Sequence, residues 1–91
     1  MAVTNEDKGK PLLTASGDAV TGYKIIDQFR WTGATTAGHT LVINDSDGKL
    51  IAKSIADIAN FETIIPLVGV SRYVNGFTVT MDSGHVEALY A

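Results

Sequence analysis

Hydrophobic and polar residues alternate along much of this chain, most strictly near the C-terminus. There, single polar residues separate Phe77, Val79 and Met81, and residues 85–90 continue in the same way. A period of two places alternate side chains on opposite faces of a strand, so one face of each segment meets a core. Together with the apolar β-branched runs, this pattern predicts strands over residues 12–15, 23–32, 40–44, 49–54, 61–65, 68–73, 77–82 and 85–90.

Short polar runs separate these strands and predict two hairpins. Asp45-Ser46-Asp47-Gly48 lies between two predicted strands, and Ser83-Gly84 lies between the last two. Glycine adopts positive φ without steric cost, and aspartate and serine bond to nearby backbone, so both runs favour tight turns. Residues 33–38 are small and polar and predict a loop. Residues 54–57 fit either a single helical turn or an irregular loop.

One predicted strand contains an interruption. In residues 23–32 a regular strand would place Ile25, Phe29 and Trp31 on one face, but Asp27 falls on the same face. A β-bulge inserts one residue and shifts the alternation, which would move the carboxylate off the apolar face. We therefore expect a bulge or a change of register near Ile26-Asp27.

Composition supports the same fold class. The chain has 8 Val, 8 Ile and 10 Thr but only 3 Glu, and β-branched side chains favour strands over helices. Short strands at spacings of about ten residues are typical of sandwiches and barrels. We expect an all-β fold, a small antiparallel β-sandwich or barrel of six to eight short strands, in a single β domain over residues 11–91. Residues 1–10 are polar and predict a flexible N-terminal arm.

The size and low charge of the chain indicate association with other protein surfaces. A chain of 91 residues builds a thin core, and small domains usually add disulfides, a metal or a partner subunit. This chain has no cysteine, only 19% charged residues and a mean hydropathy of +0.14. A soluble monomer of this size normally has a more polar surface. We therefore expect self-association or binding to another protein.

The charge and hydropathy pattern argues against two classes of partner. The net charge is −3 and basic residues form no run, which argues against nucleic acid. The longest nearly apolar stretch, residues 64–68, is far too short to span a bilayer. The polar start of the chain does not resemble a secretory signal, which together with the absence of cysteine suits assembly in a reducing cytoplasm.

No motif in the chain predicts catalysis, a cofactor or a metal. Residues 17–22 have the glycine spacing of a phosphate loop, but Tyr23 stands where the lysine belongs. Residues 44–48 resemble the start of a calcium loop without its later bidentate glutamate, and a turn explains them better. His39 and His85 lie too far apart for a local zinc motif and beside no distinctive serine context. We expect no enzyme activity and no cofactor.

Four large aromatic residues are candidates for an interface: Tyr23, Trp31, Tyr73 and Tyr90. Tyrosine and tryptophan combine an apolar body with a polar group, which favours positions at the boundary between protein and solvent. Such side chains anchor protein interfaces or stack on sugars. Packing in the core or half-core is the alternative, and it is left open for these four residues.

Residues 29–45, FRWTGATTAGHTLVIND, together with residues 74–80 and 83–86, carry a resemblance to a known group. The chain resembles small all-β structural proteins of tailed bacteriophage virions, most of all those that decorate or cement the capsid. The resemblance implies a homo-oligomer, a trimer or a dimer, that binds between major capsid proteins on the capsid exterior after assembly in the bacterial host cytoplasm. It implies no catalytic residue.

The leading hypothesis is therefore a non-enzymatic capsid decoration or cement protein that stabilises the phage head. Tail and head-completion proteins share this composition and stay open as alternatives. Another alternative is a tail-fibre or carbohydrate-binding adhesin module that uses Trp31 and the tyrosines. The least favoured is a small enzyme, which would need a cleft that joins His39 or His85 to a carboxylate.

Overall fold

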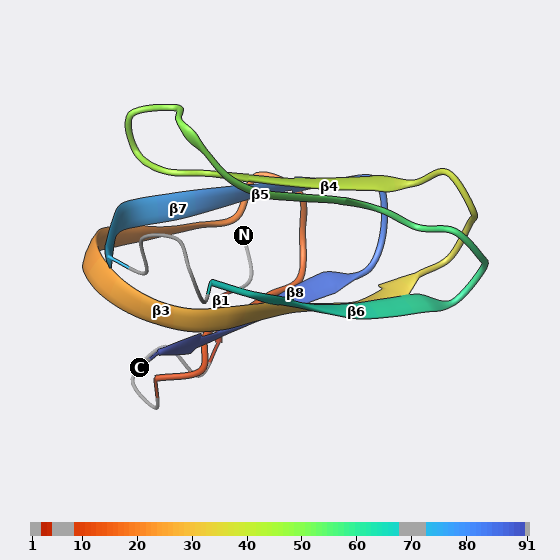
Figure 1. The fold of residues 1–91 in the computed structure, drawn as a ribbon, viewed down its shortest axis with the longest axis horizontal. Helices are drawn as coiled ribbons and strands as arrows, with labels where there is room; N and C mark the ends of the chain where they lie inside the picture. The colour runs from red at the N-terminus through yellow and green to blue at the C-terminus, as the bar shows by residue number, and fades with distance from the viewer. Residues whose placement is uncertain (1–2, 5–8, 68–72, 91) are drawn as a thin grey trace.

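The computed structural model describes residues 3–4, 9–67 and 73–90, and in these residues the chain forms antiparallel strands joined by turns and loops (Figure 1). This confirms the predicted all-β fold, and the number of strands lies within the expected six to eight. The strands are β1 (Val3–Thr4), β2 (Leu12–Leu13), β3 (Ala19–Ala34), β4 (Thr40–Asn44), β5 (Leu50–Ile55), β6 (Phe61–Pro66), β7 (Tyr73–Met81) and β8 (His85–Tyr90). The described residues include no helix with the length and hydropathy of a membrane span.

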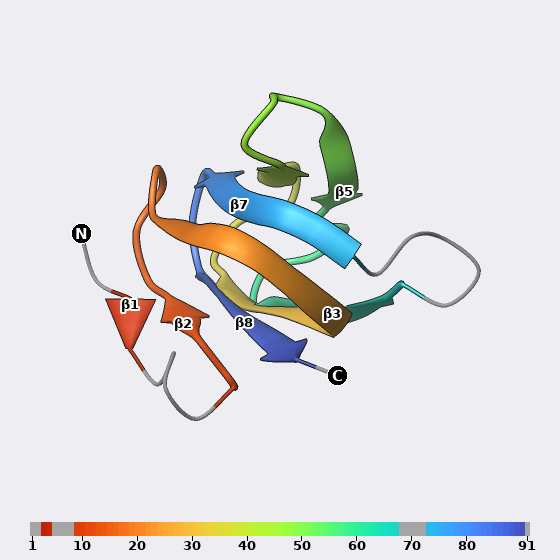
Figure 2. The same ribbon diagram turned by 90° about the vertical axis from the view of Figure 1, so that its left-hand side faces the viewer.

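Strand β3 belongs to two layers. Its first half, Ala19–Ile25, pairs with β7, and its second half pairs with β8 on one side and β6 on the other. The order of strands is β1-β2-β8-β3-β7-β4-β5, with β6 paired to β3 outside this path. Figures 1 and 2 show the result as a sandwich, with β4, β5 and β7 in one layer and β2, β6 and β8 in the other. The long strand bends from the first layer into the second.

The predicted bulge lies at the bend of β3. Ile26 is opposite Tyr90 but Gln28 is opposite Leu89, so the register shifts at Asp27. Before the shift the buried side chain is Ile26, and after it the buried side chains are Phe29 and Trp31. The extra residue therefore changes which alternate positions face the core and keeps Asp27 off the apolar face.

The core lies between the two layers and is formed by the chain itself. Among the residues that the structure describes, seventeen hydrophobic ones are buried. Across the layers the rings of Phe29 and Phe77 pack edge to face at 5.2 Å, and within one layer those of Trp31 on β3 and Phe61 on the neighbouring β6 do so at 5.9 Å. Such offset aromatic pairs add to the burial of apolar area. The side chains of one copy thus fill the core. The surface expected from the composition to bind a partner therefore consists of exposed residues.

The first predicted hairpin is confirmed. Strands β4 and β5 pair through the turn 45–48, where Asp45 Oδ1 accepts hydrogen bonds of 2.9 Å from the backbone N–H of Asp47 and of Lys49. Gly48 has a φ of 82°, which favours glycine. The acidic run that resembles a calcium loop therefore uses an aspartate oxygen to close its own turn.

The second predicted hairpin is wrong. Strand β7 pairs with β3 and β4, whereas β8 pairs with β2 and β3, so the two strands are not partners and lie in different layers. The turn Asp82–Gly84 carries the chain across the sandwich (Figure 1). The prediction failed because alternation reports which face is buried but says nothing about which strand supplies the neighbour.

The other expected boundaries differ by a few residues. Strand β2 is shorter than predicted, β3 is longer at both ends, and residues 54–57 form the end of β5 and the start of a loop. The strand expected over residues 68–73 falls almost entirely outside the described residues. Within the expected N-terminal arm, Val3 and Thr4 pair with Leu13 and Leu12.

Candidate functional site

The four aromatic candidates do not form one site. Trp31 has an exposed fraction of 0%, and its indole N–H donates a 3.0 Å hydrogen bond to the Ser83 carbonyl. It is therefore a core residue with no face available for a partner or a sugar, so the adhesin alternative loses its main aromatic. Tyr23 is 64% exposed, and Tyr90 is half-buried with the Lys24 ammonium 5.8 Å from its ring centre.

Three of the four aromatic positions meet at the bend of β3. The register places Tyr73 opposite Ile25 and Tyr90 opposite Ile26, while Tyr23 lies two residues before Ile25. Only the backbone of Tyr73 is described, so the position of its ring is outside the structure. The sequence gives no sign of this meeting, because the residues come from three strands.

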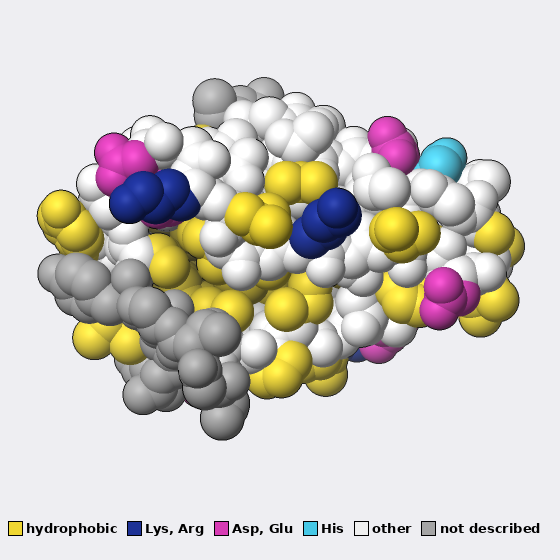
Figure 3. All heavy atoms as spheres, turned by 45° about the horizontal axis from the view of Figure 1, so that its top comes forward, with side chains coloured by type: hydrophobic (Ala, Val, Ile, Leu, Met, Phe, Trp, Pro, Cys, Tyr) yellow, Lys and Arg dark blue, Asp and Glu magenta, His cyan; other side chains and the backbone are white. Residues whose placement is uncertain are grey.

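A second set of candidates consists of exposed apolar side chains, of which the sequence pattern had pointed only to Tyr23. The large exposed hydrophobic residues are Tyr23, Ile25, Leu50, Ile55, Ile58 and Ile64. Two lie at the bend of β3, and the other four lie on β5, on β6 and in the loop between them. Figure 3 shows hydrophobic side chains spread along this side of the molecule, with charged groups sparse and mostly toward its ends.

Within the described part of the chain, strand β5 is one edge of the first layer and β6 is one edge of the second, whose opposite edge is β1. Strand β5 pairs with β4 alone, and β6 pairs with β3 alone. A bulge between Ala52 and Leu50 places Leu50 on the same outward face as Ile55, because their partners Asn44 and Thr40 share that face. An edge strand offers free backbone N–H and C=O groups for another strand. Both layers thus end in an edge that combines backbone hydrogen-bonding groups with exposed isoleucine or leucine.

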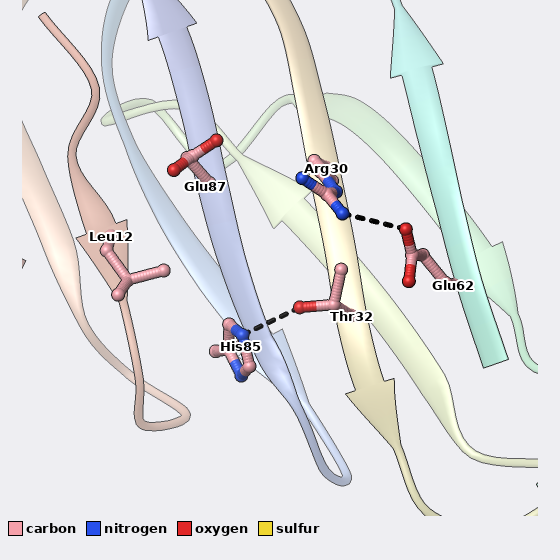
Figure 4. Close-up of a pocket in the computed structure, with 6 residues that line it drawn as sticks. All are labelled: Leu12, Arg30, Thr32, Glu62, His85 and Glu87. Atoms are coloured by element: carbon pink, nitrogen blue, oxygen red, sulfur yellow. Dashed lines mark hydrogen bonds and ion pairs between the residues drawn. The ribbon is translucent and has the colours of Figure 1, made fainter. Parts of the chain in front are cut away.

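The outer face of the β2-β8-β3-β6 layer contains a shallow polar pocket of about 220 Å³, drawn in Figure 4 and lined by Leu12, Arg30, Thr32, Glu62, His85 and Glu87. Arg30 Nη2 lies 2.8 Å from Glu62 Oε1, and Thr32 Oγ1 lies 2.7 Å from His85 Nε2. Both pairs join neighbouring strands. Exposed ion pairs of this kind stabilise a fold by about 0–1 kcal/mol.

This pocket contains a histidine and two carboxylates, which is the arrangement that the enzyme alternative required. The hydrogen bond drawn for His85 goes to Thr32, while Glu62 bonds to Arg30 (Figure 4). A catalytic base needs a third group that orients its imidazole. Among the described contacts no carboxylate takes that role for His85, so the pocket offers a polar surface without an assembled catalytic triad.

A separate hydrogen-bonded cluster, here called the turn clamp, consists of Thr35, His39, Thr40, Asp82 and Ser83. Ser83 Oγ accepts a 3.0 Å bond from Thr35 N–H and lies 2.7 Å from His39 Nδ1. Asp82 Oδ2 accepts bonds of 2.9 Å from Thr40 N–H and 3.2 Å from Thr40 Oγ1. These contacts tie the turn between the layers to the start of β4.

The turn clamp also perturbs one titration. The Thr40 backbone N–H lowers the pKa of Asp82 below 3.8, with help from the Thr40 hydroxyl and the nearby His39 and against a small effect of burial. Hydrogen bonds to a carboxylate favour its charged form. Ser83, His39 and Asp82 thus lie close together. The Asp82 carboxylate bonds to Thr40, so the cluster holds the turn against the start of β4.

The described residues form no assembled metal site and no phosphate loop. No group of three or more histidine, cysteine, aspartate or glutamate side chains there is arranged to hold a metal ion. Of the two glycines in the phosphate-loop spacing, Gly17 lies in a turn and Gly22 lies within β3. A strand therefore stands where a phosphate loop would require the start of a helix.

Comparison with known proteins identifies no relative: no family model matches the chain, and neither does any curated protein or solved structure.

Proposed function

We propose that this chain is a non-enzymatic structural protein of a tailed bacteriophage virion, a decoration protein that binds as a homo-oligomer between major capsid proteins on the capsid exterior. The observation that carries the proposal is the exposure of Leu50, Ile55, Ile58 and Ile64 at the two edge strands of a chain that already fills its own core. The resemblance of residues 29–45, 74–80 and 83–86 to such proteins supports the same function.

The energetic argument concerns what the exposed side chains contribute. They add little to the stability of the fold, because each keeps about half or more of its surface in water. Full burial of one leucine or isoleucine against a partner contributes about 1.5–3 kcal/mol relative to exposure. Part of this gain is offset by the entropy lost on association. Several such contacts, repeated over the many copies on a shell, would hold neighbouring capsid proteins together.

The proposal is tested by co-sedimentation of the purified chain with mature capsids of the virus that encodes it. We expect the wild type to pellet with the capsids and to raise the temperature at which they disrupt. Ile64→Asp should lower capsid affinity about tenfold or more, because it places a charge on an apolar contact. Ala15→Asp is the matched control, since it adds the same charge at an exposed turn far along the chain from both edges.

Two results would contradict the proposal. One is a wild-type chain that stays in the supernatant at saturating capsid concentration. The other is equal binding of the wild type and of a double variant, Ile58→Asp with Ile64→Asp, which would show that these two exposed residues take no part in capsid binding.

A further inference from the structure

We infer that two copies of this chain associate through their β5 edges, in an antiparallel pair with Ile55 on the two-fold axis. The pair would join the two β3-β7-β4-β5 layers into one continuous sheet. The inference rests on the proposed function by naming the contact within its homo-oligomer. It concerns the purified chain alone, so it stands or falls separately from capsid binding.

The first argument comes from the direction of the backbone groups of β5. Ala56 N–H donates to His39 O and Ala56 O accepts from Gly38 N–H, both at 2.8 Å, so this residue bonds toward β4. Backbone groups of successive residues in a strand point to alternate sides. Lys53 and Ile55 therefore direct their N–H and C=O groups to the outer edge of β5, where no described strand pairs with them.

The second argument comes from the side chains on the outer face. Ala52 and Ala56 are buried beneath the strand, whereas Lys53, Ile55 and Asp57 are exposed. Lys53 and Ile55 alternate with the buried residues and share the outward face of β5, and Asp57 follows two residues later in the bend just beyond the end of the strand. From Lys53 through Ile55 to Asp57, the exposed side chains near the end of β5 are thus basic, apolar and acidic in turn.

The third argument is the charge complementarity of this short run with a second copy of itself. In an antiparallel pair centred on Ile55, Lys53 of each copy lies opposite Asp57 of the other, and the two Ile55 side chains lie together. Opposite charges and β-branched pairs at facing positions stabilise strand pairing. A pair centred on Lys53 would instead place two ammonium groups together, which is destabilising. Lys53 therefore disfavours the pair centred on itself and favours the pair centred on Ile55.

The test is sedimentation equilibrium of the purified chain over the micromolar range. We expect a reversible dimer for the wild type. Lys53→Glu and Asp57→Lys should each weaken it about tenfold or more, because each places like charges at two facing positions. The double variant Lys53→Glu with Asp57→Lys restores opposite charges across the axis, so it should restore dimerisation.

The controls separate the β5 contact from general effects of charge and folding. Lys49→Glu makes the same charge change in the exposed turn before β5 and should leave the dimer intact. Ile55→Thr keeps a β-branched residue and should weaken the dimer by removing the apolar contact. The fluorescence of buried Trp31 reports that each variant is folded.

Three results would overturn the inference. They are a wild type that is monomeric at every concentration, a dimer unaffected by Lys53→Glu, and a double variant that fails to recover. A monomeric wild type whose capsid binding is lost in Ile55→Thr would assign the β5 edge to the capsid protein. A wild-type dimer that fails to bind capsids would contradict the proposed function and leave the β5 contact standing.

Discussion

Single polar residues decide how this chain turns between its layers. Asp27 stands at the bulge in β3 where the buried face changes from Ile26 to Phe29. Asp82 accepts two hydrogen bonds from Thr40 at the turn that leads from β7 to β8. Both residues are acids at which an apolar alternation stops, and both mark a place where the backbone changes direction.

Asp82→Asn tests the turn clamp through the pH dependence of stability. The pKa of Asp82 is lowered in the folded protein from 3.8, so its charged form stabilises the fold above that pH, and the contribution is lost as pH falls through the folded pKa. The variant should be less stable than wild type at neutral pH, and the difference should shrink in acid. Urea midpoints measured at neutral pH and in steps below pH 3.8 check this.

Asp47→Asn is the matched control, because it also removes one exposed carboxylate and lies outside both the turn clamp and the β5 contact. A difference between wild type and Asp82→Asn that stays constant down to the lowest pH would contradict the stabilising role of the charged carboxylate.

At the scale of the elements, two turn glycines, Gly48 and Gly84, differ in how closely neighbouring atoms surround them. Gly48 and Gly84 have almost the same φ, 82° and 83°, and both were recognised in the sequence as turn glycines. Gly48 closes a hairpin in open space, since nothing lies within 4 Å of a Cβ built there. Gly84 passes against β3, where such a Cβ would press on the Thr32 carbonyl and lie 3.0 Å from the Ala34 amide nitrogen.

Alanine substitution at these two glycines distinguishes backbone strain from crowding. Gly48→Ala should cost about 1–2 kcal/mol, because an L-residue is placed in the left-handed region. Gly84→Ala should cost about 1–3 kcal/mol more, because the same strain is joined by a clash with backbone. Equilibrium urea unfolding of both variants gives the comparison. Equal losses would show that the β7–β8 turn has room to move away from β3.

At the scale of the whole molecule, we expect β3 to make the sandwich one cooperative unit. The same strand pairs with β7 in one layer and with β6 and β8 in the other. Loss of either layer would expose the shared core and leave β3 without half of its partners. Small single domains of this kind unfold in one transition.

Ile26→Val tests this cooperativity at the bend. Ile26 is fully buried, and removal of one methylene from a core isoleucine costs about 0.5–1.5 kcal/mol. Trp31 fluorescence and far-UV circular dichroism should shift to the same lower urea midpoint. Ile25→Val, at a position 48% exposed, is the matched control and should cost less. Different midpoints for the two probes would indicate that the layers unfold separately.

Most of the strands could be predicted from the sequence, because alternation of Phe77, Val79 and Met81 or of Val86 and Ala88 records burial on one face, which is a local property. The bulge at Asp27 was also predictable, since a carboxylate on an apolar face is costly. The residues at the candidate interface could be predicted less well from the sequence. Trp31 was weighed as an interface residue, yet it is buried, and its bond to Ser83 joins residues 52 positions apart.

The sequence by itself determined the fold class, the hairpin β4–β5 and the need for a turn at Ser83-Gly84, because period, β-branching and turn residues act over a few neighbouring positions. Only the tertiary structure decided that β7 and β8 face each other across a core, that β3 serves both layers, and that Leu50, Ile55, Ile58 and Ile64 stay in solvent. These features depend on which distant strands pair. Pairing is selected by the packing of the whole core, and it leaves β5 and β6 as the apolar edges of the protein.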